Sequence, residues 1–276
     1  MPVTSANRRD VIDENDPDLI PFRSMRTANW TVGSGWFIAE GPLLVDRLLH
    51  SDYGVHSALV DTVHVDEWSE RIPSHAPMLV ATPQLISQLV GFKFHRGVLA
   101  CGLRRPIAVL RDVITQPLAC DATLVAVQGV QDPENLGGIL RSCAALGVDR
   151  VIIGPNSADP FSRRVLRVSM GTVLKLQLAR SHDLIDDLTW LAEHHGVQSI
   201  ATTLSHDAEP LERATRTSPL VILLGNEAQG LPDALQRACD RRVRINMRLG
   251  IDSLNVSVAA GIVLHHFCRY RPPAIR

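Results

Sequence analysis

In the second half of the chain, segments with a strand-like pattern of apolar residues mostly alternate with segments of helical spacing. Short apolar runs, typical of buried strands, are followed by stretches in which apolar residues recur at helical spacing. The predicted strands span residues 124–130, 151–154, 174–178, 199–203, 220–224 and 242–245. The predicted helices span residues 136–146, 162–169, 184–195, 232–238 and 254–267. This alternation predicts an α/β fold with a parallel sheet covered by helices on both faces.

The first half of the chain has a less regular pattern. Residues 1–28 are polar without a sustained period, and we interpret them as a loose N-terminal arm able to fold back on the body. Residues 29–104 combine helical spacing with strand-like runs and predict a small α/β domain. Arginines and prolines punctuate residues 105–120, which we interpret as a linker. The parallel-sheet domain then occupies residues 121–276.

Composition and charge limit the classes of function. Of the 276 residues, 45% are hydrophobic and 21% are charged, as in an average globular protein. The formal net charge is −1, so no global basic field indicates a nucleic-acid partner. The positive side chains are almost all arginine, with Lys93 and Lys175 as the only lysines. Either a GC-rich genome or the recognition of phosphate groups explains this bias.

Metal, disulfide and membrane signals are weak. The five cysteines are scattered without a C-x-x-C pair, and the histidines show no ligand spacing, which disfavours a disulfide framework and a metal site. The N-terminus has no apolar signal-peptide core, and no apolar run approaches the about 20 residues that span a bilayer. We therefore expect a protein of the reducing cytoplasm with no metal and no membrane partner.

Three loops that follow predicted strands carry unusual residues, and in parallel sheets ligands bind at the carboxyl ends of the strands. The first loop and the helix that follows it, residues 131–141, place Asn135 as the predicted N-cap of that helix. Gly137 and Gly138 allow another backbone or a phosphate to approach the first turn. Arg141 lies on the same helix. Taken alone, Asn135 is explained by capping and Arg141 by a solvated helix face.

The second and third loops have the composition of binding loops. Glycines in residues 225–230 allow close approach of a ligand to the backbone. We expect the carboxylate of Glu227, at the edge of the sheet, to meet either a ligand or an arginine. The third loop, residues 245–257, leads into a helix rich in small residues that Ser253 or Asn255 caps.

Together the three loops are far more specific than any one of them. Their order and placement resemble the three signature motifs of the SpoU (TrmH) branch of the SPOUT RNA methyltransferases, over roughly residues 121–270. The motifs are Asn135 with Arg141, Gly225-Asn226-Glu227 with Gly230, and Ser253-Leu254-Asn255 with Ser257. Residues 37–41 and 95–100 are similar, more weakly, to the substrate-binding domain that precedes the catalytic domain in many members, a domain related in fold to small ribosomal RNA-binding proteins.

The resemblance implies an enzyme that transfers a methyl group from S-adenosylmethionine to a ribose 2′-hydroxyl of structured RNA. It also implies a deep trefoil knot in the C-terminal domain, a homodimer that packs through the knots, and an RNA-binding role for the N-terminal domain. The two-domain layout favours ribosomal over transfer RNA. The implied cofactor-binding residues are Leu224, Gly225, Asn226, Glu227, Gly230, Ile245, Met247, Ser253, Leu254 and Asn255.

Catalytic and RNA-binding roles follow from the same resemblance. The implied catalytic residues are Arg141, Asn135, Glu227, Ser253 and Asn255, and the implied RNA-binding residues are Arg141, Arg163, Arg164 and Arg167. The family pattern gives Arg141 the removal of the hydroxyl proton, with Asn135 positioning it. Because a guanidinium pKa lies above about 12, we favour Arg141 as a phosphate clamp and alkoxide stabiliser that can serve the partner subunit's cofactor. The proton acceptor is then the phosphate, water or a transiently neutral arginine.

Other functions fit the sequence less well. A non-catalytic RNA-binding or ribosome-assembly factor would keep the fold without needing all five implied catalytic residues. A dehydrogenase is disfavoured because no G-x-G-x-x-G follows the first strand of the second domain. A base methyltransferase is disfavoured because Ser253-Leu254-Asn255 matches the ribose branch. Asn246 stands where family members usually have proline, and we expect it to loosen the third loop.

Overall fold

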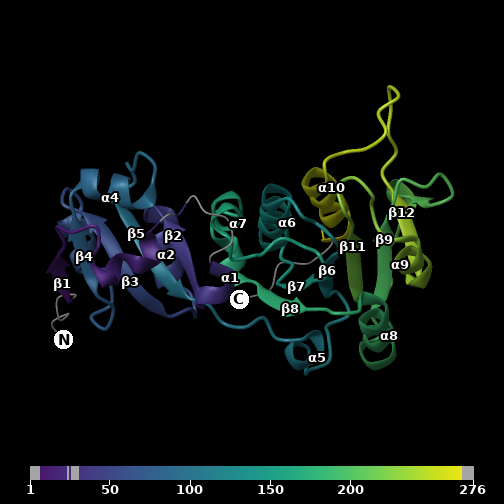
Figure 1. Cartoon of the computed structure of the whole chain (residues 1–276). Coiled ribbons are helices and arrows are strands. Elements are labelled where there is room, and N and C mark those ends of the chain that lie inside the picture. The colour runs from purple at the N-terminus through teal and green to yellow at the C-terminus, as the bar shows by residue number, and fades with distance from the viewer. Residues whose placement is uncertain (1–6, 24, 26–30, 269–276) are drawn as a thin grey trace. The chain divides into compact units, whose positions relative to one another are not determined.

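The chain forms two units in the computed structural model, which describes residues 7–23, 25 and 31–268 (Figure 1). Unit 1 comprises Met1–Pro106 together with Asp159–Leu174, and unit 2 comprises Ile107–Ala158 and Lys175–Arg276. The sequence pattern places residues 159–174 in the second domain, whereas their contacts place them in unit 1. Each unit is described separately.

Unit 2 is built on a parallel sheet, which confirms the predicted α/β architecture. In the described part of the chain this sheet has seven strands in the order β10-β12-β9-β11-β6-β7-β8, and every pairing is parallel. The strands are β6 (Thr123–Val127), β7 (Arg150–Ile153), β8 (Gln177–Arg180), β9 (Gln198–Thr202), β10 (Glu209–Pro210), β11 (Leu220–Leu224) and β12 (Arg241–Arg244). The central strands β6 and β11 are buried along their whole length, which is why they form continuous apolar runs in the sequence.

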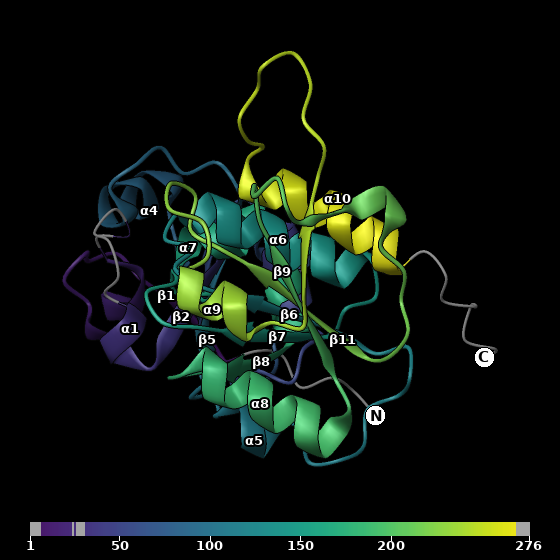
Figure 2. The same ribbon diagram turned by 90° about the vertical axis from the view of Figure 1, so that its right-hand side faces the viewer.

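Helices cover both faces of this sheet. Figure 2 shows α6 (Pro133–Ala145) and α10 (Val256–Cys268) above the sheet, and α5 (Leu110–Val113) and α8 (Leu184–His195) below it. The lower helices and α9 (Asp233–Ala238) share one apolar core with side chains of β6, β7, β9 and β11. Two short 3-10 helices lie in the connections: η2 (Thr172–Lys175) begins in the unit 1 segment and ends where unit 2 resumes, and η3 (Leu211–Arg213) follows β10.

The expected linker at residues 105–120 is not a free connection. Leu110 and Ile114 are 1% and 4% exposed and belong to the apolar core of unit 2. The backbone N–H of Arg180 donates to the carbonyl of Ala108, which ties the segment to the edge strand β8. The short apolar run between the prolines therefore packs as the first element of unit 2.

Unit 1 contains a mixed sheet of five strands among its described residues, in the order β1-β4-β3-β5-β2. The strands are β1 (Arg8–Asp10), β2 (Trp36–Glu40), β3 (Val55–Asp61), β4 (Met78–Ala81) and β5 (Val98–Leu103). The pairs β1–β4 and β3–β4 are parallel, while β2–β5 and β3–β5 are antiparallel. The helices are η1 (Pro17–Phe22), α1 (Thr31–Ser34), α2 (Pro42–Leu49), α3 (Val65–Ser69) and α4 (Pro83–Val90).

The described part of the expected N-terminal arm is integrated into unit 1. Strand β1 extends the sheet beside β4, and Leu19 and Phe22 are fully buried in the core of the unit. The arm is therefore not loose at residues 7–23. Its few apolar side chains contact the core, which its mostly polar composition does not predict. Residues 1–6, 24 and 26–28 of the expected arm lie outside the described residues.

The segment Asp159–Leu174 completes unit 1 from a later part of the sequence. Arg104 and Asp159 form a mostly buried ion pair at 2.6 Å. Phe161, 1% exposed, packs against Phe37 and Tyr53 with ring centroids 5.5 Å apart in each case. Helix α7 (Arg163–Val168) follows and covers β2. Residues that precede β6 and β7 in the sequence and residues that follow them thus share one core.

Candidate functional site

A pocket of about 450 Å³ lies in unit 2, at the carboxyl ends of β9, β11 and β12. Its walls come from the loops that follow these three strands, from Asn135 on α6 and from the start of α10. The residues singled out from the sequence that line it are Asn135, Gly225, Asn226, Glu227, Gly230, Ile245, Met247, Ser253, Leu254 and Asn255. Leu224 does not line it, because it is the fully buried last residue of β11.

The loop after β11 is a tight turn held by its own backbone. Asn226 and Gly230 exchange backbone hydrogen bonds of 3.1 and 2.9 Å. A Cβ atom on Gly225 would lie 2.4 Å from the backbone of Gly230 and Leu231, so only glycine fits there. The side chain of Asn226 accepts from the N–H groups of the turn and donates to the carbonyl of Gly129 at 2.7 Å. Asn226 therefore shapes this loop and anchors it to the loop after β6.

Three side chains join the three loops at one side of the pocket. The Nδ2 of Asn135 donates to Oε1 of Glu227 at 2.9 Å, and the Nδ2 of Asn255 donates to Oδ1 of Asn135 at 2.7 Å. Asn135 is 7% exposed, so its amide is committed to both neighbours. We call Asn135, Glu227 and Asn255 the amide–carboxylate network.

Glu227 was expected to meet either a ligand or an arginine. Among the described residues no arginine pairs with it. Its carboxylate instead accepts from the Asn135 amide, from the backbone N–H of Asp132 at 3.3 Å and from the Asn226 amide at 3.4 Å. These partners are neutral donors, and the exposed side chain of Glu227 can still accept a hydrogen bond from a ligand in the pocket.

The predicted N-cap of α6 is wrong by three residues. Helix α6 begins at Pro133, and the Asp132 carboxylate accepts from the N–H of Glu134 at 2.8 Å. Proline suits the first helical position because its missing N–H is not needed there. Asn135 lies inside the first turn, and its side chain is free to join the amide–carboxylate network.

Asn255 is the residue that caps α10, one of the two caps proposed from the sequence. Its Oδ1 accepts from the N–H and the hydroxyl of Ser257, at 2.9 and 2.6 Å. Its Nδ2 points the other way, to Asn135. One amide thus fixes the start of α10 and the network together, whereas Ser253 is an exposed residue of the pocket lining.

Arg141 stands apart from the pocket. It is exposed, does not line the pocket and makes no hydrogen bond or ion pair with the described residues. Arg141 lies six positions after Asn135 on α6, which places it about 9 Å further along the axis and on a different side of the helix. Within one chain Asn135 and Arg141 therefore do not bond to each other, and the positioning role implied for Asn135 stays a prediction.

Gly138 of α6 serves helix packing. A Cβ atom on Gly138 would lie 2.8 Å from Cβ of Ser257, so the absence of a side chain lets α6 and α10 approach closely. The expected approach of another element is thus seen at Gly138, and the approach of a phosphate to this turn stays a prediction.

The third loop rises away from the sheet between β12 and α10 (Figure 2). Its tip is exposed, with Leu249 98% exposed in a left-handed conformation at φ 58°. Asn246, which we expected to loosen the loop, is bonded to Arg244 and donates to Glu212 at 3.2 Å. The base of the loop is therefore held to η3.

The structure adds a fourth loop that sequence reasoning missed. The last residue of β9 and the loop after it, residues 202–205, line the pocket, and the Thr202 hydroxyl donates to the carbonyl of Leu223 at 2.7 Å. The signal was present, because a polar run follows a predicted strand here as it does in the other loops.

The arginines expected to bind RNA on α7 all lie in unit 1. Arg163 is engaged within the unit: its Nε donates to the buried Glu40 at 2.7 Å, and its guanidinium lies 4.3 Å from the ring centre of Phe92. Arg164 and Arg167 line a second cavity, described below. Arg163 therefore has a packing role that its sequence position does not reveal.

Within residues 7–23, 25 and 31–268, no group of three or more His, Cys, Asp or Glu side chains is placed to hold a metal ion. In the same part of the chain, no helix has the length and apolar character needed to cross a membrane.

A parallel sheet whose strand-end loops enclose a pocket of mixed polarity defines an α/β domain of the class that binds nucleotide-like cofactors. Comparison with known proteins is more specific. The chain belongs to the SpoU rRNA Methylase family, which it matches over residues 122–265, and is thus an RNA methyltransferase. The resemblance drawn from the three motifs is confirmed.

Individual relatives extend the match to nearly the whole chain. Over 269 residues it is 35% identical to an uncharacterized tRNA/rRNA methyltransferase of Mycobacterium tuberculosis, covering 95% of this chain and 92% of the relative. Over 192 residues it is 32% identical to a 23S rRNA (guanosine-2′-O-)-methyltransferase of Acinetobacter baylyi, covering 69% and 77%. The solved structure of an AdoMet-bound rRNA methyltransferase from Sinorhizobium meliloti has a TM-score of 0.84 and 27% identity, covering 96% of this chain and 99% of that one.

Proposed function

We propose that this chain transfers the methyl group of S-adenosylmethionine to a ribose 2′-hydroxyl of structured RNA, with ribosomal RNA as the substrate. The observation that carries the proposal is the amide–carboxylate network, which joins the three family motifs at one side of the pocket. The 2′-O-methylation of ribosomal RNA by the Acinetobacter relative supports the choice of substrate. The chain's five cysteines are all free, which suits a reducing cytoplasm.

The pocket fits S-adenosylmethionine in size and lining. About 450 Å³ falls within the roughly 300–1,000 Å³ of small-molecule sites. Ile245, Met247 and Leu254 offer an apolar wall for an adenine ring, and the turn at Gly225 and Gly230 lets a ligand approach backbone amides closely. When bound, the cofactor supplies a methyl group activated by its sulfonium.

The network would hold and orient the ribose. Because Asn135 and Asn255 are bonded to each other, the second N–H of each amide is set in a fixed direction. The Glu227 carboxylate can accept a hydrogen bond from a ribose hydroxyl, and the exposed Ser253 hydroxyl can donate one or accept one. Such positioning aligns the attacking oxygen, which is the main demand of an in-line displacement.

Arg141 would reach the site from a second copy of the chain. Its exposure outside the pocket of its own chain supports a homodimer in which α6 of one subunit approaches the pocket of the other. There the guanidinium would clamp the phosphate beside the reacting ribose and stabilise the developing alkoxide. We also propose that the loops after β11 and β12 form the trefoil knot of the family, as the confirmed membership implies.

The first test measures methyl incorporation from labelled S-adenosylmethionine into separate ribosomal and transfer RNA pools, followed by nuclease digestion and identification of the nucleoside. We expect a 2′-O-methylated nucleoside in the ribosomal pool. Incorporation into transfer RNA alone would refute the substrate. Clear cofactor binding without incorporation into unmodified RNA would refute the reaction and favour a non-catalytic assembly factor.

A second test examines the shared active site. Arg141→Ala and Asn255→Ala are each expected to be inactive as homodimers. If Arg141 acts in the partner's site, an equal mixture of refolded subunits contains heterodimers with one intact site, which gives about a quarter of the wild-type activity. If Arg141 acts in its own subunit, the mixture stays inactive.

A further inference from the structure

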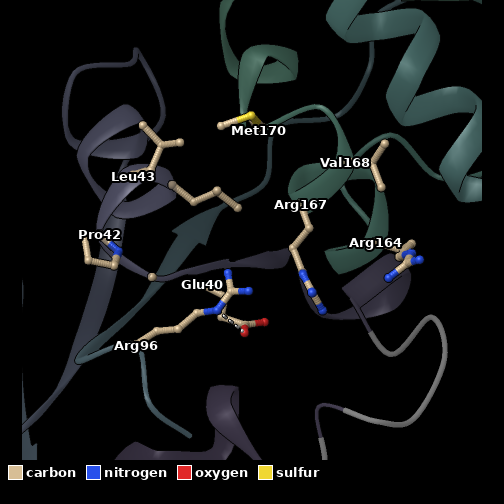
Figure 3. Close-up of a pocket in the computed structure, with 10 residues that line it drawn as sticks. Glu40, Pro42, Leu43, Arg96, Arg164, Arg167, Val168 and Met170 are labelled. Carbon is tan, nitrogen blue, oxygen red and sulfur yellow. Dashed lines mark ion pairs between the residues drawn. The ribbon is translucent and has the colours of Figure 1, made fainter.

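Unit 1 contains a second cavity, of about 310 Å³, between the β2–α2 turn and α7 (Figure 3). One part of its wall is apolar and is formed by Pro42, Leu43, Leu44, Val168 and Met170. The other part is basic, with Arg96, Arg164 and Arg167. Figure 3 shows the side chains of Arg96 and Arg167 extending toward Glu40.

Positive charge exceeds negative charge at this cavity. Glu40 is the acidic residue of the lining, and its side chain is 4% exposed. Its two oxygens are paired with Arg163 at 2.7 Å and Arg96 at 3.4 Å. Arg167 is half-buried and forms no ion pair with any residue that the structure describes. Because its guanidinium is partly removed from water and has no carboxylate partner in the described part of the chain, Arg167 favours the binding of an anion from outside the protein.

The start of α2 adds to this preference. Gly41, at φ 88°, is the N-cap and supplies no side chain to the first turn, whose residues line the cavity. Amide groups at a helix N-terminus carry partial positive charge and bind phosphate oxygens. On the opposite wall, α7 is positioned by the Phe161 and Asp159 contacts, and Arg47 donates to the carbonyl of Met170.

We propose that this cavity binds one phosphate group of the RNA backbone, with the attached nucleoside against the apolar wall. The volume is at the lower end of the range for small-ligand sites, which suits a single nucleotide of a polymer. Leu43 is 42% exposed and offers a surface for a base. The inference rests on the proposed function in one respect, namely that RNA is the substrate.

The test is filter binding of a labelled in vitro transcript of large-subunit ribosomal RNA to the full-length protein over a series of salt concentrations. Arg167→Gln should raise the Kd about 10-fold and lower the slope of log Kd against log salt by about 0.7–0.9. Arg167→Lys should keep the slope because it keeps the charge. Arg8→Gln is the matched control, since Arg8 lies on β1 at the opposite edge of the same sheet.

A second variant avoids dependence on one arginine. Leu43→Glu places a carboxylate at an exposed position of the apolar wall and should also weaken RNA binding about 10-fold. Thermal unfolding and the affinity for S-adenosylmethionine should match the wild type in all variants. Wild-type affinity and salt slope in both Arg167→Gln and Leu43→Glu would overturn the proposal.

A free nucleotide and the RNA backbone are distinguished by calorimetry with AMP. Binding of AMP that Arg167→Gln abolishes, with RNA affinity unchanged, would overturn the assignment to RNA. Methyl incorporation into the same transcript separates this proposal from the proposed function. A transcript that is bound through Arg167 but never methylated refutes the proposed function alone, whereas a methylated transcript indifferent to Arg167 and Leu43 refutes this inference alone.

Discussion

Removal of the Asn135 amide is the sharpest test of the amide–carboxylate network. Asn135→Ala deletes the bond to the charged Glu227 and the bond from Asn255. A bond to a charged group contributes about 1.5–3 kcal/mol and a neutral one about 0.5–1.5 kcal/mol. Since the pocket admits water to the broken partners, we take the lower sum of about 2 kcal/mol, which corresponds to about a 30-fold loss in kcat/KM.

The assay compares steady-state methyl transfer with equilibrium binding of S-adenosylmethionine. Asn15→Ala is the control, because Asn15 is an exposed asparagine of unit 1 that is bonded to its neighbour Asp13. It should leave kcat/KM unchanged. For Asn135→Ala, a kcat/KM within about two-fold of the wild type would refute the functional role of the network.

Asn135→Asp tests the direction of the same bond. It places a second carboxylate about 2.9 Å from that of Glu227, so that the two must share a proton and one pKa rises. The protonated pair restores a donor toward Glu227, and therefore the activity of this variant, relative to the wild type, should rise as the pH falls through the raised pKa. A relative activity independent of pH would show that no donor is needed there.

Three more predictions concern Arg141 with Asn255, the contact of α6 with α10, and the cysteines. Arg141→Ala should lose methyl transfer while its Kd for S-adenosylmethionine stays within about two-fold, whereas Asn255→Ala should weaken both, as titrations beside turnover assays will show. Gly138→Ala should cost about 1–3 kcal/mol of unfolding free energy in denaturant titration, because its Cβ would meet the facing serine of α10 at 2.8 Å; an unchanged midpoint contradicts this. Ellman's reagent at pH 8 should react rapidly with the exposed Cys120 and slowly with Cys239, whose pKa burial raises to about 11 and whose thiol is therefore protonated at that pH.

The parallel sheet was predictable because its elements carry strong local signals. Helix α8 has the predicted bounds, since the Asp183 side chain caps its first turn and Gly196, at φ 62°, ends it. Strand β11 has the predicted bounds because it is fully buried and continuously apolar. The mixed sheet of unit 1 was less predictable, because β1 consists of three exposed polar residues and pairs with a strand distant in sequence.

The candidate site was predictable in its members and not in their contacts. The rule that ligands meet the carboxyl ends of parallel strands selects most of the lining. The sequence does not show that Asp132 rather than Asn135 caps α6, because both residue types suit that position. Nor does it show that Arg163 pairs with Glu40, because side chains 123 residues apart meet only through tertiary packing.

The segment that completes unit 1 has a consequence for how the protein is made. Phe161, Asp159 and Arg163 contact their partners in unit 1 only after β6 and β7 of unit 2 have been synthesised. A nascent chain emerging at about 5–20 residues per second therefore exposes Phe37 and Glu40 for several seconds before their cover arrives. For the same reason, a fragment that stops at Pro106 lacks the cover of Phe37 and the Arg163 partner of Glu40, so that both side chains are open to solvent. To express unit 1 as a separate protein, residues 159–174 therefore have to be joined to residues 1–106.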